Sequence, residues 1–327
     1  MGDFSSIIER IDSASRVLVL SHDRPDGDAI GSAMAAALLL EKAGKSVVVM
    51  NNDKVPDLLA FLPQTERIQR PVAGEMIDCE LVLVLDSAGR DRIRDAVWEV
   101  VPEGVFTINI DHHVSNSEFA DINYVDSDSP ATGQILFQLA EAAGWEIDAE
   151  IATHLYAAIS TDTGSFRYPS TTSETMRIGG ALIDAGVDLG RTNRMLYENY
   201  PRRRVEAMQI LLQGLRFDCD GKCASVRLPL GVSGELGLQL GDTEGVIDVI
   251  RAIDSVTIAV FFEELPGGKI RVSSRSKDPA AGVGEICAIF GGGGHTLAAG
   301  ARLPGPLEDA EERFLSEVRR KLDSLQR

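Results

Sequence analysis

The chain has 327 residues, of which 44% are hydrophobic and 25% are charged, and these ordinary values exclude a disordered or fibrous protein. Its length is about twice that of a common domain, so two domains are expected. Fifty acidic residues against 32 basic ones give a formal charge of −18, which repels long polyanions and argues against long nucleic acid as a partner.

Membrane and secreted classes are also disfavoured. No apolar run approaches the roughly 20 residues that a membrane-spanning helix needs, so no membrane partner is expected. Four cysteines are too few for a disulfide scaffold, and no signal peptide precedes the first apolar segment. These features predict a cytoplasmic protein.

Apolar runs alternate with helix-period segments along the first part of the chain. Strands are expected at 17–21, 46–50, 81–85 and 105–110, and helices at 29–43, 131–143, 151–159 and 172–185. Strands that are apolar at every position are buried on both faces, as in a parallel sheet covered by helices. The pattern predicts an α/β domain with a doubly wound parallel sheet.

The second part of the chain has a different order of elements. A polar helical segment at 191–214 predicts a connector, after which strands are expected at 223–228, 255–263 and 269–276, and helices at 243–253 and 307–325. This order predicts a second, smaller α+β domain. The predicted boundaries are 1–190 for the first domain, 191–214 for the connector and 215–327 for the second domain.

Acidic and histidine residues gather where apolar segments of the first domain end. They form four clusters, at 21–28 (SHDRPDGD), 85–87 (LDS), 110–113 (IDHH) and 160–164 (STDTG). In an open α/β sheet the carboxyl ends of the strands share one edge, so these side chains are expected to meet in one site. A turn or a helix cap would explain each cluster singly, with Asp28 capping the helix at 29–43, but not their joint placement.

Five of the six aspartates in these clusters, with two or three histidines, are expected to share the site. So many carboxylates cannot all stay ionised at close range unless cations neutralise them, because each negative charge raises the pKa of its neighbours. Oxygen and imidazole ligands without thiolate favour Mn²⁺ first, and then Mg²⁺ or Co²⁺. The candidates outnumber the ligands of a single catalytic ion, so two ions per chain are expected.

A basic strip and a glycine run mark the second domain. Residues 267–302 hold five basic residues and two acidic ones, a local charge of +3 in an acidic chain. Glycines without a Cβ let backbone N–H groups approach a phosphate, and an arginine binds phosphate with two parallel hydrogen bonds. The run Gly291 to His295, together with Arg275, therefore predicts a phosphate clamp, with a plain glycine-rich turn as the alternative.

The motifs resemble those of a known family. His22-x-x-Pro25-Asp26-x-Asp28, Asp86, Asp111-His112-His113 and Thr161-Asp162-Thr163-Gly164 resemble the four motifs of the DHH phosphoesterase superfamily. Arg271 to Ser276 and Gly291 to His295 resemble the DHHA1 domain that accompanies them. Within the superfamily the chain is most similar to the NrnA-like group of bacterial nanoRNases and pAp phosphatases.

The resemblance implies a role for each motif residue. One metal ion would be held by His22, Asp26 and Asp86, and the second by Asp28, Asp86, His112 and Asp162, so that Asp86 bridges the two. The catalytic residues would be His113, which faces the scissile phosphate, and Asp111, which orients the histidine pair. The implied substrate-binding residues are Ser273, Arg275, Gly292, Gly293, Gly294 and His295.

The expected reaction is hydrolysis of a phosphoester by a metal-activated water. The implied substrates are 3′-phosphoadenosine 5′-phosphate (pAp), converted to AMP, and oligoribonucleotides of two to about five nucleotides, because a small basic strip on an acidic body neutralises few phosphates. A phosphodiesterase for cyclic di-AMP or linear pApA would use the same residues and stays an alternative. A non-catalytic nucleotide sensor is disfavoured by the intact motifs. The sequence leaves a homodimer open.

Overall fold

The structure is a computed structural model that describes residues 3–239, 242–243 and 245–325. The chain divides into two compact units, Met1–Asn199 and Tyr200–Arg327, each with its own sheet. Within the described residues, no helix combines the length and the apolar character needed to cross a membrane. The boundaries that the sequence analysis gives for the connector and its two flanking domains stay predictions.

The first unit is built on a five-stranded sheet in which every neighbouring pair of strands is parallel. The strand order is β2-β1-β3-β4-β5, which places β1, β3 and β4 next to one another. The strands are β1 (Arg16–Ser21), β2 (Ser46–Met50), β3 (Leu81–Leu85), β4 (Phe106–Asp111) and β5 (Ile122–Val125).

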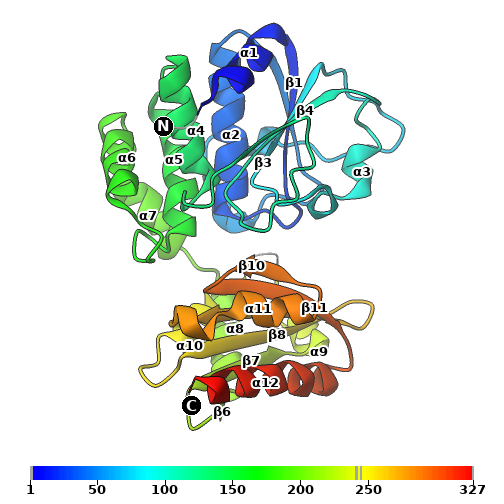
Figure 1. Cartoon of the computed structure of the whole chain (residues 1–327), viewed down its shortest axis with the longest axis vertical. Helices are drawn as coiled ribbons and strands as arrows, with labels where there is room; N and C mark the ends of the chain where they lie inside the picture. The colour runs from blue at the N-terminus through cyan, green and yellow to red at the C-terminus, as the bar shows by residue number, and fades with distance from the viewer. Residues whose placement is uncertain (1–2, 240–241, 244, 326–327) are drawn as a thin grey trace. The chain divides into compact units, whose positions relative to one another are not determined.

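Helices cover both faces of this sheet (Figure 1). Val17 and Val19 of β1 pack with the layer that contains α2, α4 and α5, whereas Leu18 and Leu20 pack with Val97 on the other face. This arrangement confirms the predicted doubly wound α/β fold. The helices are α1 (Ser5–Ser13), α2 (Gly27–Lys42), α3 (Asp95–Trp98), α4 (Thr132–Ala143), α5 (Ala149–Asp162), α6 (Ser173–Asp184) and α7 (Leu189–Tyr197), with 3₁₀ turns η1 (Asp57–Leu59), η2 (Thr65–Arg67) and η3 (Arg90–Arg92).

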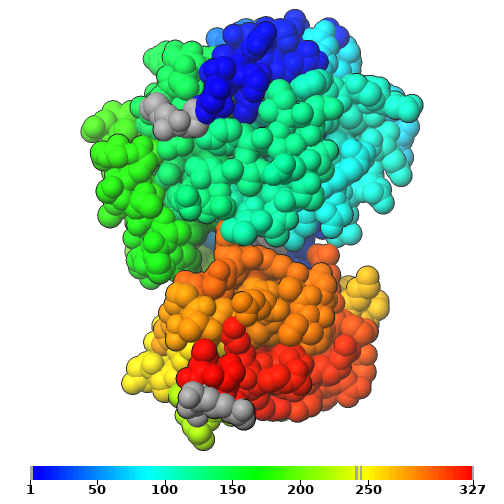
Figure 2. All heavy atoms as spheres, viewed as in Figure 1, coloured from blue at the N-terminus to red at the C-terminus, as the bar shows by residue number. Residues whose placement is uncertain are grey.

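The second unit holds a six-stranded mixed sheet, order β10-β11-β9-β8-β7-β6, in which β7 and β8 pair in parallel. On one face of the sheet, Phe262 packs with Phe314 of α12, and α11 lies beside α12 on the surface (Figure 2). On the other face, Phe261 packs with Ile250 of α10. The prediction of a second α+β domain is confirmed. Its elements are α8 (Arg202–Gln213), β6 (Arg216–Asp218), β7 (Cys223–Leu228), α9 (Leu230–Glu235), α10 (Val246–Arg251), β8 (Ile258–Leu265), β9 (Lys269–Ser276), η4 (Pro279–Ala281), α11 (Val283–Ile289), β10 (Gly293–His295), β11 (Ala298–Pro304) and α12 (Leu307–Ser324).

Several elements differ from the sequence-based expectation. The helical segment predicted at 191–214 is two helices, α7 and α8, separated at Pro201, whose ring cannot continue a helix. Part of the glycine run forms a strand, β10, which pairs with β11. The helix predicted at 243–253 includes residue 244, which lies outside the described residues, and α10 itself spans Val246–Arg251.

The central helix of the first unit, α2, packs closely against α5. All residues from Gly27 to Leu40 are buried, so α2 is covered on every side. A Cβ added at Gly31 would lie 2.5 Å from the carbonyl oxygen of His154 and 3.0 Å from the Cβ of Ala158, both in α5. Gly31 therefore sets the distance between α2, which carries Asp28, and α5, which ends at Asp162.

Replacing Gly31 by Ala should lower the free energy of unfolding by about 1–3 kcal/mol, because the added methyl group must push α2 and α5 apart. Gly180→Ala is the matched control. Gly180 is exposed in α6 with no atom within 4 Å of an added Cβ, so this change should raise the stability by about 0.5–1 kcal/mol. Urea denaturation measures both, and equal effects of the two changes would contradict the close packing.

Candidate metal centre

The predicted clusters meet at one edge of the first sheet. His22 follows β1, Asp86 follows β3 and His112 follows β4, and these three strands are neighbours in the sheet. Asp28 lies in the first turn of α2, and Asp162 is the last residue of α5. All five residues lie in the first unit, and the buried core of that unit surrounds them.

Among the described residues, histidine and carboxylate ligand atoms gather in four overlapping groups, two of which contain only predicted metal ligands. Ligand atoms of His22, Asp26 and Asp86 lie within 4.8 Å of one another, and those of Asp28, His112 and Asp162 do the same. The first set contains the three residues that the resemblance implies for one ion, and the second contains those that it implies for the other ion except Asp86. The donors are carboxylate oxygens and imidazole nitrogens, which suit a hard or borderline divalent ion.

Asp86 lies between the two groups. Its Oδ2 atom is 3.4 Å from Nε2 of His22, and its Oδ1 atom is 3.4 Å from Nε2 of His112. Its backbone adopts a left-handed conformation with φ of 54°, which an aspartate tolerates better than most residues. The carboxylate therefore presents one oxygen to each group, as a ligand that bridges two ions must.

Main-chain carbonyl groups orient the rings of His22 and His112 through hydrogen bonds to Nδ1. The Nδ1–H of His22 donates to the carbonyl of Asp23 at 2.8 Å, and the Nδ1–H of His112 donates to the carbonyl of Ser129 at 3.3 Å. In each ring Nε2 is then the nitrogen on the side of the carboxylates. This is the tautomer in which a neutral histidine binds a metal ion.

The start of α4 holds Asp28 in place. Its Oδ2 atom accepts a hydrogen bond from the backbone N–H of Thr132 at 2.6 Å, and its Oδ1 atom accepts one from Gly133 at 2.9 Å and one from the Ser32 hydroxyl at 2.8 Å. The Thr132 hydroxyl also donates to Oδ1 of Asp86 at 3.3 Å. The partial positive charge of a helix N-terminus thus stabilises a carboxylate group that is fully buried.

Sequence reasoning missed the residues that support the site and assigned one cap to the wrong residue. Thr132 and Ser32 were not predicted, although Thr132 begins the helix expected at 131–143, where backbone N–H groups can bind an anion. Asp26 caps α2 by accepting hydrogen bonds from Asp28 and Ala29, so Asp28 is not the cap.

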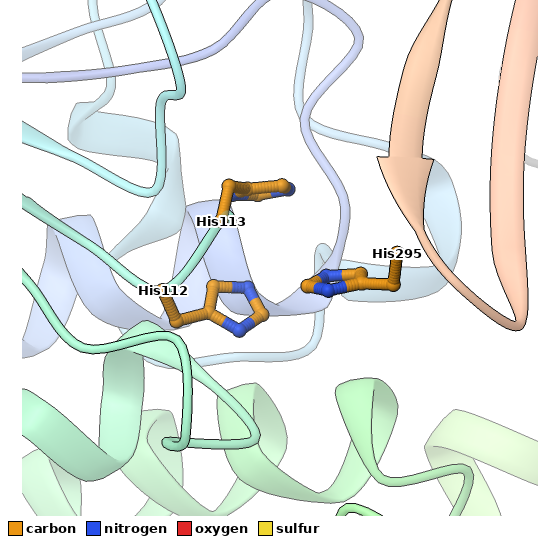
Figure 3. A group of neighbouring side chains, drawn as sticks. All are labelled: His112, His113 and His295. Atoms are coloured by element: carbon orange, nitrogen blue, oxygen red, sulfur yellow. The ribbon is translucent and has the colours of Figure 1, made fainter. Parts of the chain in front are cut away.

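Asp111 and His113 form a separate pair. Nδ1 of His113 donates to Oδ1 of Asp111 at 2.8 Å, and the rings of His112 and His113 project from the end of β4 with centroids 4.7 Å apart (Figure 3). Asp111 is fully buried and His113 is partly exposed. The pair therefore has one histidine that reaches the surface of the site and one carboxylate that lies beneath it.

Burial and mutual repulsion change the acidity of the carboxylates. Burial, together with the charge of Asp86, raises the pKa of Asp28 to about 7, and burial and the charge of Asp28 raise the pKa of Asp162 well above its usual range. Burial opposes ionisation of Asp86 too, but hydrogen bonds from His112 and His22 hold its pKa well below its usual range. Metal-free protein thus retains protons at this site near neutral pH.

In His22 and His112, the neighbouring carboxylates raise the pKa more than burial lowers it. Burial alone would lower the pKa of His22, but its contacts with Asp26 and Asp86 raise it well above the usual value. The pKa of His112 is raised in the same way by its contacts with Asp86 and Asp162, against the effect of burial. A divalent cation in this site must displace these protons before it can bind.

Four of the six predicted substrate-binding residues lie on one face of the sheet in the second unit. Arg275 in β9 is opposite Ala298 in β11, which is opposite His295 in β10 (Figure 3 labels His295). Side chains directly opposite one another share a face of the sheet, so Arg275 and His295 flank a small alanine. In the neighbouring row Ser273 is opposite a glycine of β11, which is opposite Gly293.

Two glycines of this surface cannot be replaced without moving the backbone. A Cβ added at Gly292 would lie 2.2 Å from the carbonyl oxygen of Gly300, and one at Gly294 would lie 2.6 Å from that of Ala298. Gly294 also has a φ of 134°, which side chains other than hydrogen rarely permit. These two positions of the glycine run next to His295 therefore cannot carry a side chain.

The basic strip is partly neutralised within the second unit. Arg271 contacts Glu263 at 2.5 Å, and Lys277 donates to the carbonyl groups of Ile253 and Asp254 at 2.6 and 3.3 Å. The guanidinium of Arg275 donates to the neighbouring carbonyl of Ser274 at 3.1 Å and, among the described residues, forms no salt bridge with a carboxylate. The charge available to a ligand is thus smaller than the sequence count of +3.

We predict that metal affinity rises with pH between 6 and 8. Groups whose pKa is raised, such as Asp28, His22 and His112, hold protons in the metal-free protein at low pH and lose them as the pH increases. For the same reason metal-free protein should lose stability as pH rises through about 7, and added metal should restore it. Calorimetry in buffers of different ionisation enthalpy measures the protons released; affinity independent of pH would contradict the assignment.

Asp86→Asn should reduce the metal content of the chain from two ions to one or none and abolish turnover, because the amide removes the negative charge that faces both groups. Asp184→Asn makes the same change of charge at an exposed position in α6 and should leave the metal content unchanged. Elemental analysis of the two variants measures the number of metal ions per chain. Two ions per chain in Asp86→Asn would show that this carboxylate bridges nothing.

Comparison with known families assigns the two parts of the chain separately. The profile of the "DHH family, N-terminal domain" matches residues 16–159, and the profile of the "DHHA1 domain" matches residues 223–324. These matches cover every metal-ligand candidate except Asp162, and the sheet of the second unit from β7 onwards.

The chain is similar to proteins of the same length in several bacteria. It is 34% identical over 308 residues to the bifunctional oligoribonuclease and PAP phosphatase NrnA of Thermus thermophilus, a match that covers 94% of this chain and 90% of that protein. The protein of the same name from Bacillus subtilis is 26% identical over 317 residues, which cover 96% of this chain and 97% of that one.

A solved structure shows the same fold. The exopolyphosphatase-related protein of Bacteroides fragilis superposes with a TM-score of 0.88 at 26% identity, and the match covers 98% of this chain and 96% of that one. The family matches, the relatives and the arrangement of acidic and histidine side chains agree. The chain belongs to the DHH–DHHA1 family of phosphoesterases and is a hydrolase that acts on phosphoester bonds.

Proposed function

We propose that this hydrolase uses two divalent metal ions to cleave short oligoribonucleotides to mononucleotides and to convert pAp to AMP. The observation that carries the proposal is Asp86, a buried carboxylate with one oxygen toward His22 and the other toward His112. The substrates are suggested by the names of the relatives from Thermus thermophilus and Bacillus subtilis.

The donor set fits the metal ions that the family implies. His22, Asp26 and Asp86 would hold one ion, and Asp28, Asp86, His112 and Asp162 the other, with Mn²⁺ as the first choice for mixed oxygen and imidazole ligands. Two such ions, when bound, lower the pKa of a water molecule and neutralise charge on the phosphate oxygens. Buried carboxylates whose pKa is raised by one another's charge support this choice, because a cation removes that repulsion.

The protein's own groups would orient the phosphate and help it to carry negative charge. His113 is the partly exposed histidine next to the ligand group, and it would donate to an oxygen of the scissile phosphate. Asp111 accepts a hydrogen bond from Nδ1–H of His113, so that Nε2–H of the imidazolium form would donate to the phosphate. Asp111 would thus act as the positioning group for a catalytic His113.

The second unit would bind the remaining part of the nucleotide. Arg275 and His295 rise on either side of a floor of small residues, which would let a phosphate approach the backbone of the glycine run. Ser273 and the glycines 292–294 complete this surface. Because other basic residues of the strip are already engaged, few phosphates can be neutralised, which favours short substrates.

The proposal is tested with purified, Mn²⁺-loaded protein on pAp and on oligoribonucleotides of two, three, five and 20 nucleotides. We expect hydrolysis of pAp, and values of kcat/KM that fall steeply beyond about five nucleotides because a longer strand runs onto an acidic surface. Cyclic di-AMP, linear pApA and pyrophosphate are assayed in parallel. Equal or rising kcat/KM toward the 20-mer, or a preference for cyclic di-AMP over every short oligonucleotide, would contradict the proposal.

The same assay locates the substrate-binding surface. Arg275→Ala should raise KM for pAp and the dinucleotide about tenfold or more and leave the metal content unchanged, since this group would bind ground state and transition state alike. Arg320→Ala removes the same charge from an exposed position in α12 and should have no effect. An unchanged KM in Arg275→Ala would place the phosphate contact elsewhere.

A further inference from the structure

A chain of hydrogen bonds runs beneath His113 and ends at two asparagines. Oδ1 of Asp111 accepts from Nδ1 of His113 at 2.8 Å, and Oδ2 of Asp111 accepts from Nδ2 of Asn116 at 2.6 Å. Nδ2 of Asn116 also donates to Oδ1 of Asn109 at 2.8 Å. Asn109 is fully buried in β4, where its own amide group donates to the carbonyls of Val84 and Ser87, both at 3.3 Å.

The orientation of the Asn116 amide group is fixed by its contacts. Its Nδ2 atom faces three oxygens, those of Asp111, Asn109 and the carbonyl of Ser87, the last at 3.2 Å. Its Oδ1 atom accepts from the backbone N–H of Glu118 at 2.7 Å. A flipped amide would set oxygen against three oxygens and nitrogen against an N–H group, so one orientation alone satisfies the site.

The loop that carries Asn116 is itself held to the sheet edge. The backbone N–H of Asn116 donates to the carbonyl of His113 at 3.1 Å, and that of Ser117 donates to the carbonyl of Ala88 at 2.8 Å. Glu118 adopts a left-handed conformation with φ of 51° in this loop, and its backbone N–H donates to Oδ1 of Asn116. The position of the Asn116 side chain is therefore determined by the loop and not by Asp111 alone.

Two carboxylates compete for His113. Nδ1 of His113 lies 2.8 Å from Oδ1 of Asp111 but also 3.7 Å from Oδ1 of Asp86. Asp86 is the carboxylate proposed to serve both metal ions. If Asp111 were not fixed, its carboxylate could rotate away, and His113 could then turn toward Asp86.

We propose that Asn116 is a positioning residue for His113: it fixes Asp111 so that the imidazole is held by Asp111 and not by Asp86. Asn116 touches neither the proposed metal ligands nor the phosphate, and acts through Asp111. The proposal rests on the catalytic role given to His113 under the proposed function. Asn116 lies three positions after His113, outside the Asp111-His112-His113 triplet.

Two substitutions of Asn116 remove its donor in different ways. Asn116→Ala deletes the amide group, and Asn116→Asp keeps the shape but places a carboxylate against Asp111. Both should lower kcat about 10- to 100-fold, with Asn116→Asp the more damaging, while two metal ions per chain are retained and KM changes less than about twofold. Ser117→Ala is the control, because its hydroxyl contacts the carbonyl of Ala88 and leaves Asp111 untouched.

A double-mutant cycle with His113→Ala separates positioning from general damage. If Asn116 acts through His113, adding Asn116→Ala to His113→Ala should lower kcat less than about twofold further. If the two losses multiply in full, the proposal is overturned. The cycle is measured with pAp and with bis(p-nitrophenyl) phosphate, so that an incorrect assignment of the natural substrate does not decide the outcome.

A spectroscopic readout does not depend on activity. The five histidines allow the ¹⁵N signals of His113 to be assigned by comparison with His113→Ala. We expect the Nδ1–H signal of wild-type protein to be retained in Ser117→Ala and to shift in both Asn116 variants. An unchanged His113 signal in a folded Asn116 variant, or failure of both variants to fold, would overturn the proposal by assigning Asn116 to the fold alone.

Discussion

Repulsion among buried carboxylates is the constraint on which the first unit depends. Asp28 and Asp86 are both almost inaccessible to water, and Asp162 lies beside them. In a protein interior such charges repel one another strongly, and each must be offset by hydrogen bonds, a positive group or a cation. The surrounding elements supply hydrogen bonds and positive groups to these carboxylates. The carboxylate and imidazole donors of the site suit a cation as well.

The fold supplies this compensation through ordinary features of α/β proteins. The N-terminus of α4 offers two backbone N–H groups to Asp28, and the parallel order of β1, β3 and β4 brings His22, Asp86 and His112 to one edge. Close packing at Gly31 then fixes the distance between α2 and α5. A small change in that distance would separate Asp28 from the end of α5, so stability and chemistry are linked through one glycine.

The sequence was sufficient to predict the α/β class, the second α+β domain and the convergence of the acidic clusters, because periodicity and strand ends follow local rules. It was not sufficient to predict Thr132 or Asn116, whose donors reach residues that are distant in the chain or in a loop of irregular shape. It also gave no signal for β10, since a glycine run has little preference for a strand and forms one here by pairing with β11.

We propose that Asp86 joins two metal ions in one site. Electron paramagnetic resonance of the Mn²⁺-loaded protein tests this proposal, because two Mn²⁺ ions that share a carboxylate ligand interact magnetically. We expect two Mn²⁺ ions per chain with the spectrum of an exchange-coupled pair, and loss of that coupling in Asp86→Asn. A spectrum of isolated Mn²⁺ ions at full occupancy, or saturation at one ion per chain, would contradict it.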